Sequence, residues 1–87
     1  MKKITMFTMA SCPYCQGALR IMDILFEENP DYLTLEIEKI DEIVYPDIAK
    51  KYDYYYVPTF YVGDQKLHEG AATIKKVRRV FDAALER

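Results

Sequence analysis

Residues 3–30 read KITMFTMASCPYCQGALRIMDILFEENP. After its leading lysine, the segment 3–8 is β-branched and apolar, which is typical of a buried strand. From Pro13 onward apolar side chains recur at helical spacing, and proline suits the first position of a helix, so the sequence predicts a helix over residues 13–28. Asn29-Pro30 ends this helix. The tetrad CPYC therefore lies where a strand gives way to a helix.

Two further elements are predicted directly after this helix. Residues 33–38 alternate leucine or isoleucine with threonine or glutamate, which predicts a half-buried strand, favoured at the edge of a sheet. Residues 46–53 are interpreted as a short helix that opens with Pro46.

The C-terminal part of the chain predicts a hairpin and a last helix. Residues 58–62 are interpreted as a strand, Gly63-Asp64 as a turn, and residues 66–69 as a strand that pairs back. Residues 73–86 place their apolar side chains on one helical face, with Thr73 as the expected N-cap.

The predicted element order is β-α-β-α-β-β-α, which indicates an α/β fold. The first two strands are joined through a helix and should be parallel, whereas the hairpin adds antiparallel strands. The expected architecture is a four-stranded mixed sheet with three flanking helices.

The composition favours one small globular domain over residues 1–87. The chain has 51% hydrophobic residues and a net charge of -2, which argues against disorder and against nucleic-acid binding. No apolar run approaches the roughly 20 residues of a membrane span. The apolar part of the N-terminus is too short for a signal peptide. We therefore expect a cytoplasmic protein, with a monomer as the default state.

Charge is distributed unevenly along the chain. Residues 23–53 hold 10 acidic and 3 basic side chains, and residues 66–87 hold 6 basic and 3 acidic ones. The basic residues crowd the start of the last predicted helix, where they oppose the helix dipole: Lys75, Lys76, Arg78 and Arg79. They indicate either a docking face for an acidic partner or an ordinary solvated face.

The chain has two cysteines, Cys12 and Cys15, two residues apart. A secreted domain stapled by disulfides would have more cysteines, spread along the chain. A bridge over so short a loop constrains little of the unfolded chain and adds little stability. Pairing of these thiols is therefore better explained by redox chemistry than by structure.

The position of the two thiols predicts different roles for them. Cys12 falls at the N-cap or first position of the helix, where unpaired N–H groups and the helix dipole should lower its pKa. Cys15 lies one turn later on the apolar side, so it should be more buried and less ionised. An exposed Cys12 thiolate that attacks a disulfide, and a second thiol that resolves the mixed disulfide, would form a dithiol exchanger.

Other interpretations of the cysteines remain open. A zinc site needs about four ligands, and besides the two thiols the chain offers one histidine, His68, expected on the surface of the hairpin. We therefore expect no metal site within one chain. An iron–sulfur cluster shared in a dimer, or two inert core cysteines, are the remaining options.

Two motifs together resemble those of the thioredoxin/glutaredoxin superfamily. The first is Cys12-Pro13-Tyr14-Cys15, which is similar to the tetrad of dithiol glutaredoxins, and the second is Val57-Pro58-Thr59 before the hairpin. The predicted element order is similar to the minimal fold of this family over essentially the whole chain. The resemblance implies a thioredoxin-like fold with a cis bond before Pro58, near the cysteines. It also implies that the Val57 backbone is free to pair with an extended substrate.

The features that separate the two subfamilies are mixed. Gly70-Ala71 before the last helix resembles the substrate loop of thioredoxins, whereas glutaredoxins have a Gly-Gly and a polar or acidic pair that grip glutathione. Thioredoxins carry a buried aspartate about six residues before the first cysteine, where this chain has Met6. The chain thus resembles the small glutaredoxin-like thioredoxins of archaea and bacteria.

The resemblance implies a thiol–disulfide oxidoreductase that reduces protein disulfides, with Cys12 as nucleophile and Cys15 as resolving thiol. The residues implied to form its shallow substrate groove are Pro13, Tyr14, Tyr56, Val57, Pro58, Thr59, Gly70 and Ala71. No bound cofactor is implied, because electrons come from NADPH through a flavoprotein reductase or from glutathione. The alternatives are a glutathione-dependent glutaredoxin acting on mixed disulfides, a glutathione-ligated iron–sulfur module, and a non-catalytic interaction domain.

Four tyrosines lead into Val57-Pro58, namely Tyr52, Tyr54, Tyr55 and Tyr56. Either one or two of them form an aromatic wall beside the dithiol, or they pack the loop and leave their hydroxyls in water.

Overall fold

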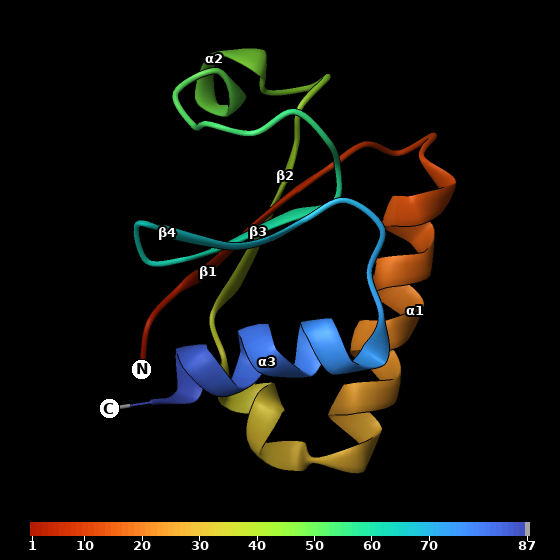
Figure 1. Cartoon of the computed structure of the whole chain (residues 1–87), viewed down its shortest axis with the longest axis vertical. Helices are drawn as coiled ribbons and strands as arrows, with labels where there is room; N and C mark the ends of the chain where they lie inside the picture. Colours follow the sequence, from red (N-terminus) through yellow and green to blue (C-terminus); the bar gives the residue numbers. More distant parts are fainter. Residues whose placement is uncertain (87) are drawn as a thin grey trace.

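The computed structural model describes residues 1–86, and its first two elements agree with the sequence (Figure 1). Strand β1 spans Ile4–Thr8 and helix α1 spans Pro13–Glu28. Cys12 is the N-cap of α1 and proline is its first residue. Asn29 is the C-cap, and its N–H donates to the carbonyl of Leu25. The predicted start and end of this helix are confirmed.

The sheet has the predicted number of strands and mixed direction. Its strand order is β2-β1-β3-β4, with β1 parallel to β2 and antiparallel to β3, and β3 antiparallel to β4. The remaining strands are β2, Ile37–Asp41, β3, Thr59–Val62, and β4, Gln65–Glu69. Strands β2 and β4 form the edges.

The edge strand β2 carries an ion pair, and the edge strand β4 contains a register shift. On β2, Glu38 pairs with Lys3 of the neighbouring strand region at 2.6 Å. On β4, the register shifts at Leu67, because Phe60 and Tyr61 of β3 face His68 and Lys66. The extra residue is a β-bulge.

The prediction of a strand over residues 33–38 was wrong in position. Residues Pro30–Thr34 form a 3₁₀ helix, η1, and β2 begins only at Ile37. The Asn29 side chain accepts from the Asp31 N–H at 3.1 Å, and the Thr34 hydroxyl donates to the Asp31 carbonyl at 2.7 Å. These local hydrogen bonds satisfy the backbone in a turn, which competes with strand formation. Leu33, expected in the core, is 66% exposed.

The second helix is shorter than predicted. Helix α2 spans Pro46–Ala49, whereas the prediction extended to residue 53. The chain leaves the helix and places two tyrosine rings on Phe7 of β1, with centroid distances of 4.6 Å to Tyr52 and 4.8 Å to Tyr54. Aromatic packing on the sheet thus ends the helix early.

Two helices cover one face of the sheet and α2 lies on the other (Figure 1). Helix α3 spans Ile74–Leu85, and the hydroxyl of its predicted N-cap, Thr73, accepts from the Lys76 N–H at 3.2 Å. Helices α1 and α3 cross and contact each other, and they pack on the sheet, as expected for an α/β fold. None of the helices in residues 1–86 is long and apolar enough to cross a membrane.

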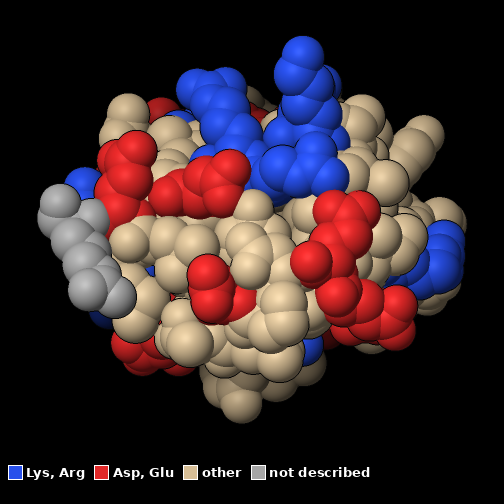
Figure 2. Space-filling view, turned by 90° about the horizontal axis from the view of Figure 1, so that it is seen from below, with Lys and Arg blue, Asp and Glu red and all other residues tan. Residues whose placement is uncertain are grey.

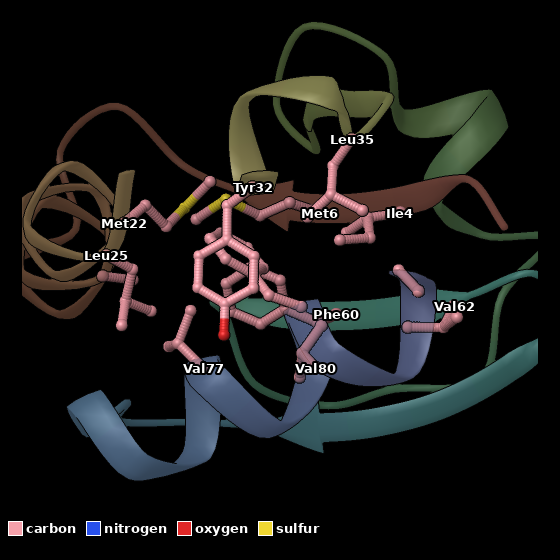
Figure 3. Packing of buried hydrophobic residues seen from close by; sticks show 13 residues of the cluster. Ile4, Met6, Met22, Leu25, Tyr32, Leu35, Phe60, Val62, Val77 and Val80 are labelled. Carbon is pink, nitrogen blue, oxygen red and sulfur yellow. The ribbon is translucent and has the colours of Figure 1, made fainter. Parts of the chain in front are cut away.

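The larger core lies between the sheet and these two helices (Figure 3). Phe81 of α3 is fully buried, stacks on Phe26 at 5.5 Å and meets the edge of Tyr32 at 5.1 Å. The Tyr32 hydroxyl donates to Asp82 of α3 at 2.5 Å. This contact fixes η1 under α3. The smaller core, on the other face, consists of Phe7, Ile40, Ala49 and Tyr61, with Tyr52, Tyr54 and Val57 packed against it.

Candidate functional site

Cys12 is the N-cap of α1 and Cys15 lies in its first turn, and both are free thiols. Cys15 is 1% exposed, as expected for the apolar side of the helix. Cys12 is only 7% exposed, so the expectation of an openly exposed thiol was wrong. The reason is a neighbouring loop, since the Cys12 Sγ lies 3.9 Å from the Val57 carbonyl and donates to it.

The two thiols differ in acidity in the predicted direction. The pKa of Cys12 is lowered, chiefly because the backbone N–H of Cys15 donates to its sulfur, helped by the Cys15 thiol and the Tyr14 N–H. The pKa of Cys15 is raised, chiefly by burial, against a hydrogen bond with the Thr8 hydroxyl. The first sulfur therefore favours the thiolate and the second favours the thiol.

This difference predicts a pH dependence for alkylation by iodoacetamide. Only thiolates react, so Cys12 should be modified at a pH below the ordinary thiol value of about 8.5, where Cys15 stays protonated and unmodified. The protein would be exposed to iodoacetamide for on the order of minutes at each pH from about 5 to about 10. Peptide mass spectrometry would then give the alkylation rate of each cysteine at each pH. Equal rates at all pH values would contradict the difference in acidity between the two thiols.

The segment before β3 lies against the dithiol. The Val57–Pro58 peptide bond is cis, as the resemblance implied, and Pro58 is fully buried. The Thr59 hydroxyl donates to the Tyr56 carbonyl at 2.5 Å, and the Gly70 N–H donates to the Pro58 carbonyl at 2.8 Å. The structure therefore brings the predicted residues 56–59 and Gly70 together, with Val57 beside Cys12.

The loop before α3 is held by the histidine that was expected on the hairpin surface. Gly70 has a φ of 94°, a conformation that glycine adopts without strain. His68 is half-buried, and its Nε2 lies 3.0 Å from the Gly70 carbonyl and 3.1 Å from that of Ala71. Ala71 itself is exposed. Within residues 1–86 no group of three or more side chains that could ligate a metal occurs.

The tyrosines divide into two groups. Tyr52 and Tyr54 pack on Phe7 and belong to the smaller core. Tyr56 is 71% exposed and Tyr14, between the two cysteines, is 65% exposed. The packing interpretation therefore holds for the first pair, and the exposed rings next to Val57 and Cys12 are free to contact a substrate.

Sequence analysis missed Glu42, which follows β2. Its N–H donates to the Thr8 carbonyl at 2.9 Å, and its carboxylate accepts from the Tyr54 hydroxyl at 2.8 Å. The pKa of Tyr54 is raised, first by burial and then by this carboxylate. The negative charge of Glu42 also opposes ionisation of Cys12. The signal available in the sequence was an acidic residue just after a strand parallel to β1, since such strand ends meet at one edge of a sheet.

A shallow hollow of about 290 Å³ adjoins Glu42. Its lining combines aromatic, aliphatic and charged side chains from α2 and the loops on either side of it: Glu42, Ile43, Pro46, Ala49, Lys50, Tyr52, Tyr54 and Tyr55. The smaller core thus ends in an open surface of mixed polar and apolar character.

Glu69 of β4 was also missed by sequence analysis. Its carboxylate accepts from the backbone N–H groups of Tyr55 and Tyr56 and pairs with Lys66 at 2.8 Å. The salt bridge and the two N–H donors lower the pKa of Glu69 to about 2, so it is ionised at neutral pH. No local sequence pattern connects Glu69 with a loop more than ten residues earlier.

The basic residues of α3 lie among acidic ones. Figure 2, which views the molecule from the side of α3 and η1, shows Lys and Arg side chains gathered beside Asp and Glu side chains. Arg78 pairs with Glu28 at 2.9 Å, and the surface hollow that contains Lys75, Arg78 and Arg79 also contains Asp82. This arrangement favours a solvated face over a docking face for an acidic partner.

The chain is similar in sequence to a known protein over most of the length of both. The chain is 34% identical over 71 residues to a thioredoxin of Methanocaldococcus jannaschii, a match that covers 82% of this chain and 81% of that protein. No protein-family model matches the chain.

Two solved structures have the same fold as this chain. An uncharacterized thioredoxin-like protein from Clostridium perfringens has a TM-score of 0.70 at 23% identity, over 98% of this chain and 71% of that one. Oxidized thioredoxin O1 from Arabidopsis thaliana has a TM-score of 0.67 at 22% identity, over 95% and 77%.

Proposed function

Since this chain belongs to the thioredoxin/glutaredoxin superfamily of thiol–disulfide oxidoreductases, we propose that it reduces protein disulfides by dithiol exchange. In this proposal Cys12 is the nucleophile and Cys15 the resolving thiol. The observation that carries the proposal is the pair of free thiols at the start of α1, with Cys12 at the N-cap against the Val57 carbonyl and Cys15 buried in the first turn. The opposite directions of their pKa changes support the same roles.

The exchange has two steps. The Cys12 thiolate attacks one sulfur of the target disulfide, a new S–S bond forms, and the other target sulfur leaves as a thiolate that takes a proton. Cys15 then loses its proton and attacks the Cys12 sulfur, which releases the second target thiol. The target gains two electrons, and the Cys12–Cys15 pair is left as a disulfide. A reductant must then restore the two thiols.

The substrate chain is proposed to lie along Val57. Within residues 1–86 the Val57 N–H donates no hydrogen bond, and its carbonyl receives only the weak thiol donor of Cys12. An extended peptide can therefore pair with this backbone, as in strand addition, and present its disulfide to the sulfur. The proposed groove is completed by Pro13, Tyr14, Tyr56, Pro58, Thr59, Gly70 and Ala71.

A flavoprotein reductase that uses NADPH is the proposed electron donor. The loop Gly70–Thr73 contains no acidic side chain, although an acidic group there would bind the amine of glutathione. The thioredoxin likeness supports the same choice. A cytoplasmic location, a monomeric state and the absence of a bound cofactor are parts of this proposal.

The proposal predicts which donors support turnover. With dithiothreitol as a chemical donor, the protein should reduce insulin disulfides, and Cys12→Ser should not. With NADPH, glutathione, glutathione reductase and a small mixed disulfide, NADPH consumption should stay close to the protein-free rate. Strong consumption would instead indicate a glutaredoxin. Failure to reduce insulin with dithiothreitol would exclude the proposed activity.

A further inference from the structure

Strand β4 holds the loop before the cis peptide bond through one carboxylate. One oxygen of Glu69 accepts from the N–H groups of both Tyr55 and Tyr56, the latter at 2.8 Å. The other oxygen pairs with Lys66 at 2.8 Å. The same lysine donates to the Asp53 carbonyl at 3.2 Å. The Glu69–Lys66 pair therefore contacts the loop at three backbone positions.

On its upstream side the loop is held by this pair and by the Tyr61 hydroxyl, which donates to the Asp53 carbonyl at 2.7 Å. Downstream, the Thr59 hydroxyl donates to the Tyr56 carbonyl and the Gly70 N–H donates to the Pro58 carbonyl. Upstream, within residues 1–86, the Tyr55 and Tyr56 N–H groups donate only to Glu69. Hydrogen bonds to an ionised acceptor are about twice as strong as neutral ones.

Tyr55 and Tyr56, which Glu69 holds, directly precede the residue that contacts Cys12. Tyr56 precedes Val57, whose carbonyl lies 3.9 Å from the Cys12 sulfur. A shift of the Tyr55–Tyr56 backbone would therefore move the edge with which an extended peptide is proposed to pair. It would leave the lowered pKa of Cys12 unchanged, because the hydrogen bonds that lower it come from Tyr14 and Cys15.

We propose that Glu69, held by Lys66, is a positioning residue that orders the Tyr55–Val57 backbone for binding the extended chain on either side of a protein disulfide. This inference rests on the proposed function. It also implies a preference for disulfides within polypeptides over small disulfides, which have no backbone for Val57 to pair with.

The test compares a peptide disulfide with a small disulfide. For Glu69→Ala, KM for the peptide should rise about tenfold while kcat stays within about twofold, since two hydrogen bonds to a charged group are lost. With 2-hydroxyethyl disulfide, kcat/KM should change less than about twofold, because no backbone pairing is involved. Glu69→Gln keeps an acceptor oxygen and should partly restore the KM.

Two other variants serve as controls. Glu38→Ala removes a glutamate that pairs with Lys3 and lies on β2, the edge strand opposite β4. The KM of this variant for the peptide and for the small disulfide should therefore match wild type. Lys66→Met should raise the peptide KM less than Glu69→Ala does, because the carboxylate remains. The pH midpoint of Cys12 alkylation should be the same in all these variants, because the hydrogen bonds that lower its pKa come from Tyr14 and Cys15.

The outcomes separate this inference from the proposed function. An unchanged peptide KM in Glu69→Ala, with wild type active on both substrates, would overturn the positioning role alone. An equal loss on both substrates would also overturn it, since that indicates general structural damage. Should Glu69→Ala fail to fold, Glu69→Gln and Lys66→Met give the same comparison. A wild type inactive on both substrates would remove both proposals.

Discussion

Replacing Cys15 with serine should convert the protein into a trap for its substrates. The Cys12 thiolate can still attack, because its pKa is lowered partly by the Cys15 and Tyr14 N–H groups, which the substitution keeps. The mixed disulfide then persists, since the thiol that would resolve it is gone. Incubation with a peptide disulfide followed by intact-mass measurement should show nearly complete addition of one peptide half.

Cys12→Ser should lose the first step instead. A serine hydroxyl does not ionise near neutral pH, so disulfide reduction should fall by more than about a thousandfold and no peptide adduct should form. The double variant Cys12→Ser/Cys15→Ser is the matched control for adventitious attachment. Full multiple turnover on a protein disulfide by Cys15→Ser would contradict the dithiol mechanism, because one thiol would then suffice.

The largest effect on stability is expected from Phe81→Ala. This side chain is fully buried between α3 and the sheet and contacts the rings of Phe26 and Tyr32. Truncation of a buried phenylalanine costs about 3–5 kcal/mol, a large part of the roughly 5–15 kcal/mol that stabilises a small domain. The midpoint of thermal unfolding should therefore fall by at least about 12 °C, measured by far-UV circular dichroism.

Leu33→Ala is the matched control for this substitution. Leu33 is apolar but lies exposed on η1, so its truncation should change the free energy of unfolding by less than about 0.5 kcal/mol. A Phe81→Ala protein as stable as Leu33→Ala would mean that the core between α1, α3 and the sheet is not packed as described.

The elements predicted best are those with both a regular spacing of apolar side chains and a capping residue or proline at the end. Pro13 and Asn29 mark the limits of α1, and Thr73 marks the start of α3. Strand β2 was misplaced because local hydrogen bonds hold residues 29–34 in a turn, and because Tyr32 of this turn bonds to Asp82, fifty residues away, a contact that the local sequence does not encode. The alternation of apolar and polar residues therefore predicted a strand over residues 33–38, whereas β2 spans Ile37–Asp41.

The same distinction holds for the site. Cys12, Cys15 and Pro58 belong to short motifs, and a motif can be recognised without knowing the fold. Glu42 accepts a hydrogen bond from the Tyr54 hydroxyl, and Glu69 accepts from the backbone of the loop before Val57. These partners are distant in the sequence, and only the folded sheet brings them near the two carboxylates. Glu69 has no local signal of that kind, and the signal for Glu42, an acidic residue just after a strand, depends on placing β2 correctly.

The edges of the sheet have a consequence for behaviour at high concentration. An open edge strand is a template for pairing with another chain, and uninterrupted pairing of this kind leads to aggregation and fibrils. Strand β2 places the charged Glu38 and Lys39 at its centre, and β4 is interrupted by the bulge at Leu67 and carries Lys66. Both edges therefore resist edge-to-edge growth, so a protein proposed to accept extended chains beside its dithiol would do so without offering its own strands to a second copy.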